Sequence, residues 1–227
     1  MKKYFLLFIT LTFLFNISYS FSQQQTIAIL DFSNNSLMDK DKYSSLSGGL
    51  AEIFITELSK VSSLKIVERQ KINELIQEMQ LAQSGMVSEE TGVQVGRLVG
   101  AKYLVFGSYM VINKKIRVDT RIVEIETGLT IKAAEVTKNV SKMFEIIQTL
   151  SEKILKDLNI KLLKGEKKIL NEGNTSTEVI ELFSKGLEYE ESGDLENAKA
   201  FYMKSFKMDN NFAPVRKKLK ALLTRKK

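Results

Sequence analysis

Three strand-like segments follow one another without a helix between them, and this run constrains the fold more than any other feature. They cover residues 103–112, 116–126 and 129–137, and the connections between them are short enough for β-hairpins. In the middle segment apolar and polar side chains alternate, which predicts one face against a core and one face in solvent. The run therefore predicts an antiparallel meander.

The residues around this meander alternate between strand and helix patterns. The predicted elements before it are two strands and three helices, at residues 26–32, 43–61, 64–68, 70–82 and from Ser88 onward. A last amphipathic helix is predicted at residues 141–158. The order β-α-β-α-α-β-β-β-α predicts an α+β domain with a mixed sheet over residues 26–158.

Glycine is unusually placed in two of the predicted helices. Gly48 and Gly49 lie near the start of the first one, which we expect to form despite them. Gly92, Gly96 and Gly100 lie four residues apart in the third and predict the close approach of a neighbouring backbone. A phosphate site is disfavoured, because the segment has neither a G-x-G-x-x-G after a strand nor the ending of a P-loop.

The first 22 residues have the layout of a secretory signal peptide. Lys2 and Lys3 precede an apolar stretch at residues 4–15, and small residues precede a predicted cleavage after Ser22. The apolar stretch is shorter than the ~20 residues that span a bilayer, although retention as an anchor remains the alternative. We therefore expect an exported protein. No cysteine follows the predicted cut, so lipidation is not expected.

The composition excludes several kinds of catalysis. The chain has no His and no Cys, so it cannot contain a Ser-His-Asp triad, a cysteine nucleophile, a disulfide or a Cys/His zinc site. We expect no cofactor.

The net charge of +7 is concentrated near the C-terminus. Residues 23–160 are balanced, with 17 basic and 17 acidic side chains, so neither this body nor an exported location favours nucleic-acid binding. The seven basic residues of the end of the chain are Arg216, Lys217, Lys218, Lys220, Arg225, Lys226 and Lys227. They predict attraction to an anionic membrane surface or an acidic partner, or simply a solvated helix end.

The end of the chain forms a separate predicted unit. We expect a charged linker at residues 159–174, a helical unit at 175–223 and a basic tail at 224–227. A capping-box pattern at Thr175–Glu178 opens the unit. Its spacing resembles one tetratricopeptide repeat, through Leu182, Gly186, Tyr189, Gly193, Ala198 and Tyr202.

A single repeat of this kind cannot bury its own apolar face. We therefore expect the helical hairpin to dock on its own α+β domain, on a second copy or on a partner, and the sequence leaves these three open. The candidate partner-binding residues are Leu182, Phe183, Tyr189, Tyr202, Lys217, Lys218 and Lys220.

Five blocks of the α+β region together resemble the CsgG family, whose domain is similar to the N-terminal domain of TolB. They are residues 27–32, 49–54, 65–69, 96–108 and 123–128. The resemblance implies a periplasmic or outer-membrane-associated factor for assembly or transport. The channel-forming members are lipidated through an N-terminal cysteine, which this sequence lacks.

Three functions follow as hypotheses. The leading one is a non-enzymatic envelope protein that binds secretion or outer-membrane assembly components. The sequence leaves open whether this protein also forms a homo-oligomer. The alternative is a regulator of peptidoglycan synthases, because an activator family of that kind has a similar domain. The third is a hydrolase that uses paired carboxylates, such as Asp31 with Asp119 or Glu124. These acids are equally well explained as strand ends and solvated faces.

Overall fold

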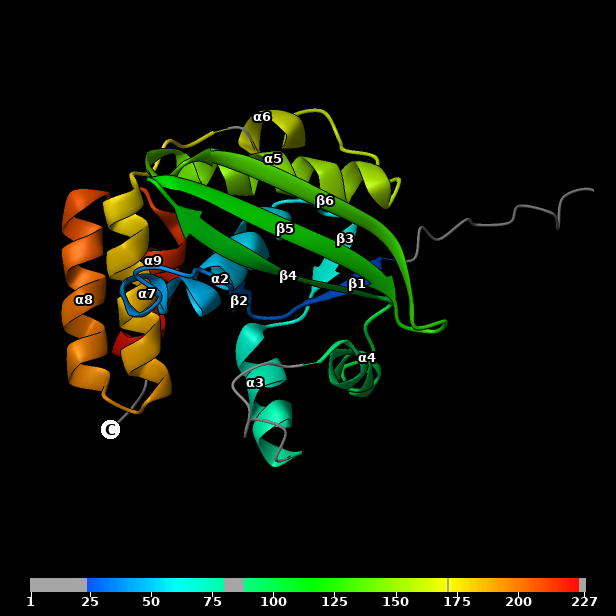
Figure 1. Cartoon of the computed structure of the whole chain (residues 1–227), viewed down its shortest axis with the longest axis horizontal. Coiled ribbons are helices and arrows are strands. Elements are labelled where there is room, and N and C mark those ends of the chain that lie inside the picture. Colours follow the sequence, from blue (N-terminus) through cyan, green and yellow to red (C-terminus); the bar gives the residue numbers. More distant parts are fainter. Residues whose placement is uncertain (1–23, 80–87, 171, 225–227) are drawn as a thin grey trace, which may run out of the picture.

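The computed structural model describes residues 24–79, 88–170 and 172–224 (Figure 1). The predicted signal peptide, the end of the helix predicted at residues 70–82, and the last three residues of the basic tail lie outside this part of the chain. Among the helices it contains, none has both the length and the apolar character needed to span a membrane.

A mixed sheet forms the centre of the α+β domain. Its strand order is β3-β1-β4-β5-β6, with β1 parallel to β3 and β4, and β4, β5 and β6 antiparallel. These strands are β1 (Gln25–Ile29), β3 (Leu64–Ile66), β4 (Tyr103–Ile112), β5 (Lys115–Glu124) and β6 (Leu129–Asn139). A short strand that the sequence did not predict, β2 (Ser33–Asn34), pairs with β4 beyond the end of β1.

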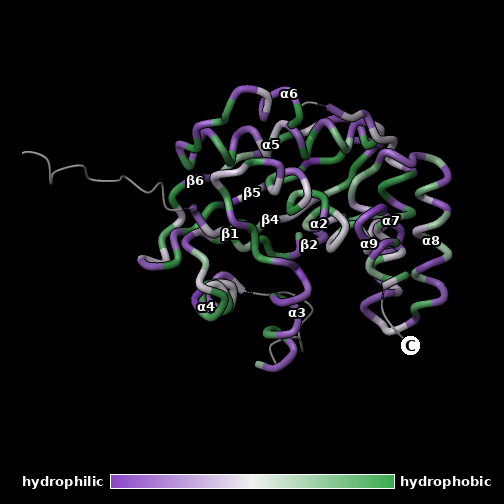
Figure 2. The backbone as a smooth tube through the Cα atoms, turned by 180° about the vertical axis from the view of Figure 1, so that it is seen from behind, coloured by the Kyte–Doolittle hydropathy of each residue, from purple (hydrophilic) through white to green (hydrophobic). Residues whose placement is uncertain are grey.

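Helices cover both faces of this sheet, and three more stand beside it (Figure 1). The helices are α2 (Leu46–Leu58), α3 (Arg69–Glu78), α4 (Glu89–Leu98), α5 (Met143–Asp157), α6 (Glu166–Leu170), α7 (Thr177–Glu191), α8 (Leu195–Met208) and α9 (Ala213–Thr224). One hydrophobic core joins the sheet to α2, α5 and the C-terminal helices, and a second joins the opposite face to α3 and α4. Seen from behind in Figure 2, apolar stretches of the chain gather around α2, β1 and β4, between these layers.

The structure confirms the α+β fold, the mixed sheet and the C-terminal helices. On β5, Ile116, Val118 and Ile122 are buried, whereas Arg117 and Arg121 are exposed, as the alternation predicted. The Ser88 hydroxyl accepts a hydrogen bond from the Thr91 backbone N–H (3.2 Å) and caps α4. The local spacing of residues was sufficient to predict these elements, because each depends on neighbours along its own strand or helix.

The glycines of α4 have a different role from the predicted one. A Cβ on Gly92 would lie 2.8 Å from the Leu30 side chain, and one on Gly96 would collide with Ile125. Side chains of the sheet therefore occupy this face of α4, where the sequence analysis expected a neighbouring backbone. Gly100 has φ +67°, a left-handed conformation that favours glycine after the helix end.

The expected linker contains a short helix that packs on the domain. Leu170 of α6 is buried, and the Glu166 carboxylate accepts hydrogen bonds from the backbone N–H groups of Ser62 (2.9 Å) and Leu163 (2.7 Å). These bonds lower the pKa of Glu166, because they stabilise its charged form. The segment is thus attached to the loop before β3.

Candidate protein-interaction site

The helices α7 and α8 form a hairpin whose turns follow from local sequence. Ser176, one residue later than the predicted capping box begins, accepts a hydrogen bond from the Val179 N–H and starts α7. Asp194 caps α8 through the Asn197 N–H (3.1 Å), after Gly193 at φ +82°. These two caps set where the helices begin.

The close contact between the two helices depends on one glycine. A Cβ on Gly186 would lie 2.5 Å from the ring of Tyr202, so only a hydrogen at this position allows the ring to lie flat against α7. Gly186 is one of the residues through which the spacing resembles a tetratricopeptide repeat. The assignment of the unit to the tetratricopeptide repeats stays a prediction.

The hairpin docks on its own α+β domain. Helix α7 lies against α2, and Ile180, Phe183 and Leu187 are buried in the same core as the residues of α2 (Figure 1). A Cβ on Gly49 would lie 2.7 Å from the Ser184 Cβ, so the two helices touch where each carries a small residue. Of the three docking modes that the sequence left open, the structure contains the intramolecular one.

A buried arginine ties the hairpin to the end of β1. Arg69, at the start of α3, is 4% exposed, and its guanidinium donates to both carboxylate oxygens of Asp31, with 2.6 Å from Nε to Oδ1, and to Glu191 at the end of α7. Burial by itself lowers the pKa of Arg69, but the two carboxylates outweigh it and the net shift is upward. Arg69 therefore stays charged. Gly48 makes room for it, because a Cβ there would lie 2.7 Å from the Arg69 Cζ.

Two of the seven predicted partner-binding residues are fully buried inside the chain. Phe183 and Tyr202 have no exposed surface and pack on each other with ring centroids 5.7 Å apart. They form the hairpin core and present nothing to a partner while the hairpin stays docked. Leu182 and Tyr189 are half-buried, and Tyr189 stacks on Phe201 at 5.3 Å.

The predicted basic residues divide into two groups. Lys217 forms ion pairs with Glu68 (2.8 Å) and Glu52 (4.0 Å), and Lys218 with Glu190 (3.2 Å), so both hold α9 against the rest of the chain. Lys220 is exposed. Intramolecular pairing therefore reduces the charge that this end of the chain offers to a membrane.

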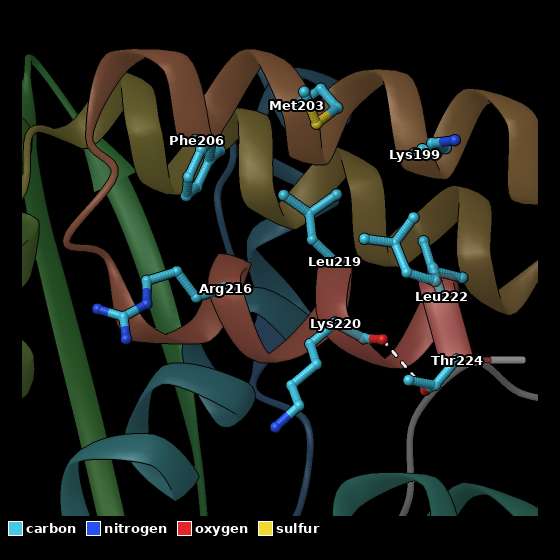
Figure 3. A pocket seen from close by; sticks show the side chains of 9 residues that line it. Lys199, Met203, Phe206, Arg216, Leu219, Lys220, Leu222 and Thr224 are labelled. Carbon is cyan, nitrogen blue, oxygen red and sulfur yellow. Dashed lines mark hydrogen bonds between the residues drawn. The ribbon is translucent and has the colours of Figure 1, made fainter.

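A groove of 410 Å³ lies between α8 and α9 (Figure 3). Its apolar lining includes Met203 and Phe206 from α8 and Leu219, Leu222 and Leu223 from α9. The cations that border it are Lys199, Arg216 and Lys220. Of these residues, only Lys220 is among the partner-binding residues predicted from the sequence. A signal was present, since the apolar residues of α8 that face away from Tyr202 recur at helical spacing.

The carboxylates considered for catalysis are engaged elsewhere. Asp31 binds Arg69, Asp119 pairs with Arg117 (2.8 Å), and Glu124 accepts from the Thr127 hydroxyl (3.2 Å). In the part of the chain that the structure describes, no group of acidic side chains is arranged to hold a metal ion.

A comparison with models of known protein families matches part of the chain. Residues 18–117 match the CsgG family. The family is described as "Curli production assembly/transport component CsgG", and the matched region contains β1 to β4 and the start of β5. The resemblance inferred from the sequence is thereby confirmed over residues 18–117, and the fifth block, at 123–128, lies beyond the match. The α+β domain that contains the matched strands and helices is the CsgG-like domain.

One curated protein is similar to this chain at low sequence identity. The protein is 27% identical over 141 residues to "Putative adenylate cyclase 3" of Rhizobium meliloti (strain 1021), an alignment that covers 62% of this chain and 22% of that protein. The chain thus spans about a fifth of that relative, and the activity in its name stays with the larger protein.

Several solved structures match part of this chain. The LpoB C-terminal domain from Salmonella enterica is 13% identical, with 52% of this chain and 84% of that chain covered and a TM-score of 0.38. Lipoprotein GNA1162 from Neisseria meningitidis is 10% identical, with 61% and 99% covered and a TM-score of 0.42. TolB from Acinetobacter baumannii is 13% identical, with 60% and 28% covered and a TM-score of 0.40. TM-scores below 0.5 carry no functional inference.

Proposed function

We propose that the protein is a non-enzymatic accessory factor of the cell envelope that acts by binding other proteins. The match of residues 18–117 to a family of curli assembly and transport components carries this proposal. The periplasm, at the outer membrane, is the proposed location, since the sequence predicts export without lipidation.

The geometry supports a division of work between two parts of the chain. The CsgG-like domain is the platform, and the α7–α9 unit is the adaptor that it carries. Contacts at Gly49, Ser184 and Arg69 hold the adaptor in one orientation on α2 and α3. A fixed orientation lowers the conformational entropy lost on binding, and this favours recognition by the adaptor.

Crosslinking in the native envelope tests this proposal. A photoreactive residue at Met203, in the α8/α9 groove, and one at Leu129, which is 66% exposed at the start of β6, would sample the adaptor and the platform. Mass spectrometry should identify secretion or outer-membrane assembly proteins from at least one position. Recovery of peptidoglycan synthases alone would replace this proposal with the regulator alternative, and recovery of no envelope protein from either position would refute both.

No observation of its own favours the hydrolase alternative. Asp31→Asn is a poor test of it, because the substitution also weakens the ion pair with Arg69. Asp119→Asn and Glu124→Gln are better, since both residues lie at the surface of β5. Loss of an observed hydrolytic activity in these variants, with partner crosslinking unchanged, would contradict the non-enzymatic proposal.

A further inference from the structure

The α8/α9 groove presents the outward faces of two packed helices. On α8 the lining residues Lys199, Met203 and Phe206 follow the spacing i, i+4 and i+7, so they lie on one face. Leu219 and Leu223 do the same on α9. The α8 and α9 faces that look toward the CsgG-like domain and α7 are already buried through Tyr202 and Val215. On α9 the groove continues this buried face, since Leu219 and Leu222 follow Val215 at i+4 and i+7, whereas on α8 it lies beside the face that carries Tyr202.

Two of the three cations at the groove lie at its ends, and the third, Lys220, lies between them in Figure 3. In Figure 3, Arg216 lies beside Phe206 at one end, and Lys199 lies at the opposite end near Leu222. Seven residues separate Lys199 from Phe206, which corresponds to about 10 Å along a helix. Within the described residues, no carboxylate lies at ion-pair distance from Lys199, Arg216 or Lys220. These three cations differ in this respect from Lys217 and Lys218, which are paired inside the chain.

The shape and the charges select among occupants. A third helix fits between two packed helices, because its side chains enter the groove at intervals of three and four residues. A second copy docked through the same groove would bring six unpaired cations together, which disfavours a symmetric dimer there. A flat lipid surface would reach protruding side chains such as Leu223, which is 73% exposed, more readily than the floor.

We propose that the α8/α9 groove binds an amphipathic helix of another protein, with acidic residues at both ends of its apolar face. The carboxylates would sit about two turns apart, at positions i and i+7, to meet Lys199 and Arg216. Leucine-type side chains between them would cover Met203, Phe206 and Leu219. The inference rests on the proposed protein-binding function and specifies the chemistry of the partner.

Fluorescence anisotropy with a designed peptide tests this chemistry. The probe is a labelled helix of about 18 residues, with Leu at i+3 and i+4 positions and Glu at two positions seven apart on the same face. The control peptide has the same composition, with both Glu residues moved to the opposite face. Saturable binding of the first peptide to the purified protein, weakened by salt and tighter than that of the control peptide, is the expected result.

Variants of the protein locate the binding. Lys199→Glu and Arg216→Glu should each weaken binding about fivefold, since each replaces an attraction by a repulsion at a partly solvated pair. Leu223→Ser should weaken it about tenfold through lost apolar contact. Lys167→Glu, on α6, makes the same change in net charge away from the groove and should leave affinity unchanged. All four positions are exposed, so circular dichroism should show an unchanged fold.

Several results would overturn the proposal. Equal binding of the two peptides would show that the acidic positions play no part in recognition. Equal binding by wild type and Lys199→Glu would show that the peptide does not bind at the groove. Association with vesicles of phosphatidylcholine and phosphatidylglycerol, without peptide binding, would assign the site to a membrane instead. Crosslinking to envelope proteins from Leu129 alone would leave the proposed function standing while the groove proposal fails.

Discussion

Gly49 is the position where a single added carbon should most directly test how the adaptor is held. In Gly49→Ala the new Cβ would lie 2.7 Å from the Ser184 Cβ and 3.4 Å from the Ser184 Cα. Carbon atoms prefer separations of about 3.5–4.0 Å, so α2 and α7 would have to move apart by roughly 1 Å. Overpacking of this kind costs about 1–3 kcal/mol, and the better helix propensity of alanine returns about 1 kcal/mol. The cost lies in the upper part of that range, because the Ser184 Oγ would lie closer still than the Ser184 Cβ, so we expect a net loss of about 1–2 kcal/mol in the free energy of unfolding.

Ser184→Gly supplies the matched test, because it exchanges the small residue between the two helices. With the Ser184 Cβ removed, the nearest remaining atom to the new methyl group on α2 is the Cα of residue 184 at 3.4 Å, an ordinary contact. The single variant should cost about 0.5–1 kcal/mol through helix propensity. In the double variant the alanine keeps its propensity gain and the clash disappears, so its stability should return to within about 1 kcal/mol of wild type.

Urea unfolding followed by circular dichroism measures these free energies, and proteolysis at residues 161–168 reports on undocking. Wild-type stability in Gly49→Ala, or a double variant as unstable as the sum of the single variants, would show that α2 and α7 do not meet at this point.

Two further predictions concern buried charge. Arg69→Met should destabilise the fold by about 1–2 kcal/mol, because Asp31 and Glu191 lose their partner but are 36% and 43% exposed and stay partly hydrated. Arg117→Met on exposed β5 should cost at most about 1 kcal/mol in the same urea titration. Glu166 has a lowered pKa in the folded state, so its contribution is present above the unfolded value of about 4.3 and is lost as the pH falls through the folded pKa. Hydrogen-exchange protection of α6, relative to the intrinsic rate at each pH, should therefore fall on acidification below about pH 4, and an unchanged pH dependence in Glu166→Gln would contradict this.

Local patterns in the sequence predicted most elements of the CsgG-like domain. The alternation on β5 and the Ser88 cap depend on residues within a few positions, and the structure contains both. Strand β2 was missed because two polar residues, Ser33 and Asn34, pair with β4 although their side chains show no strand pattern. Backbone pairing across a sheet does not require an apolar side chain.

The candidate site was predicted less well, because its contacts join residues that are far apart in the sequence. Phe183 and Tyr202 were predicted to bind a partner and are buried in the hairpin core, because a sequence cannot tell whether apolar residues face a partner or their own chain. The sequence shows that Lys217 and Lys218 are basic, but only the fold places Glu68 and Glu190 beside them. The residues that border the groove come from two helices whose relative placement is set by packing.

The sequence by itself determined the order of the longer strands and helices, the face of β5 that is buried, and the balanced charge of the body. These features are written in spacings of two to four residues and in composition. Only the tertiary structure decided that Gly48 and Gly49 serve the docking of the adaptor, that Arg69 joins Asp31 to Glu191, and that α8 and α9 form an apolar groove. Arg69 and Glu191 are 122 residues apart, and no periodicity of the chain records a contact at that distance.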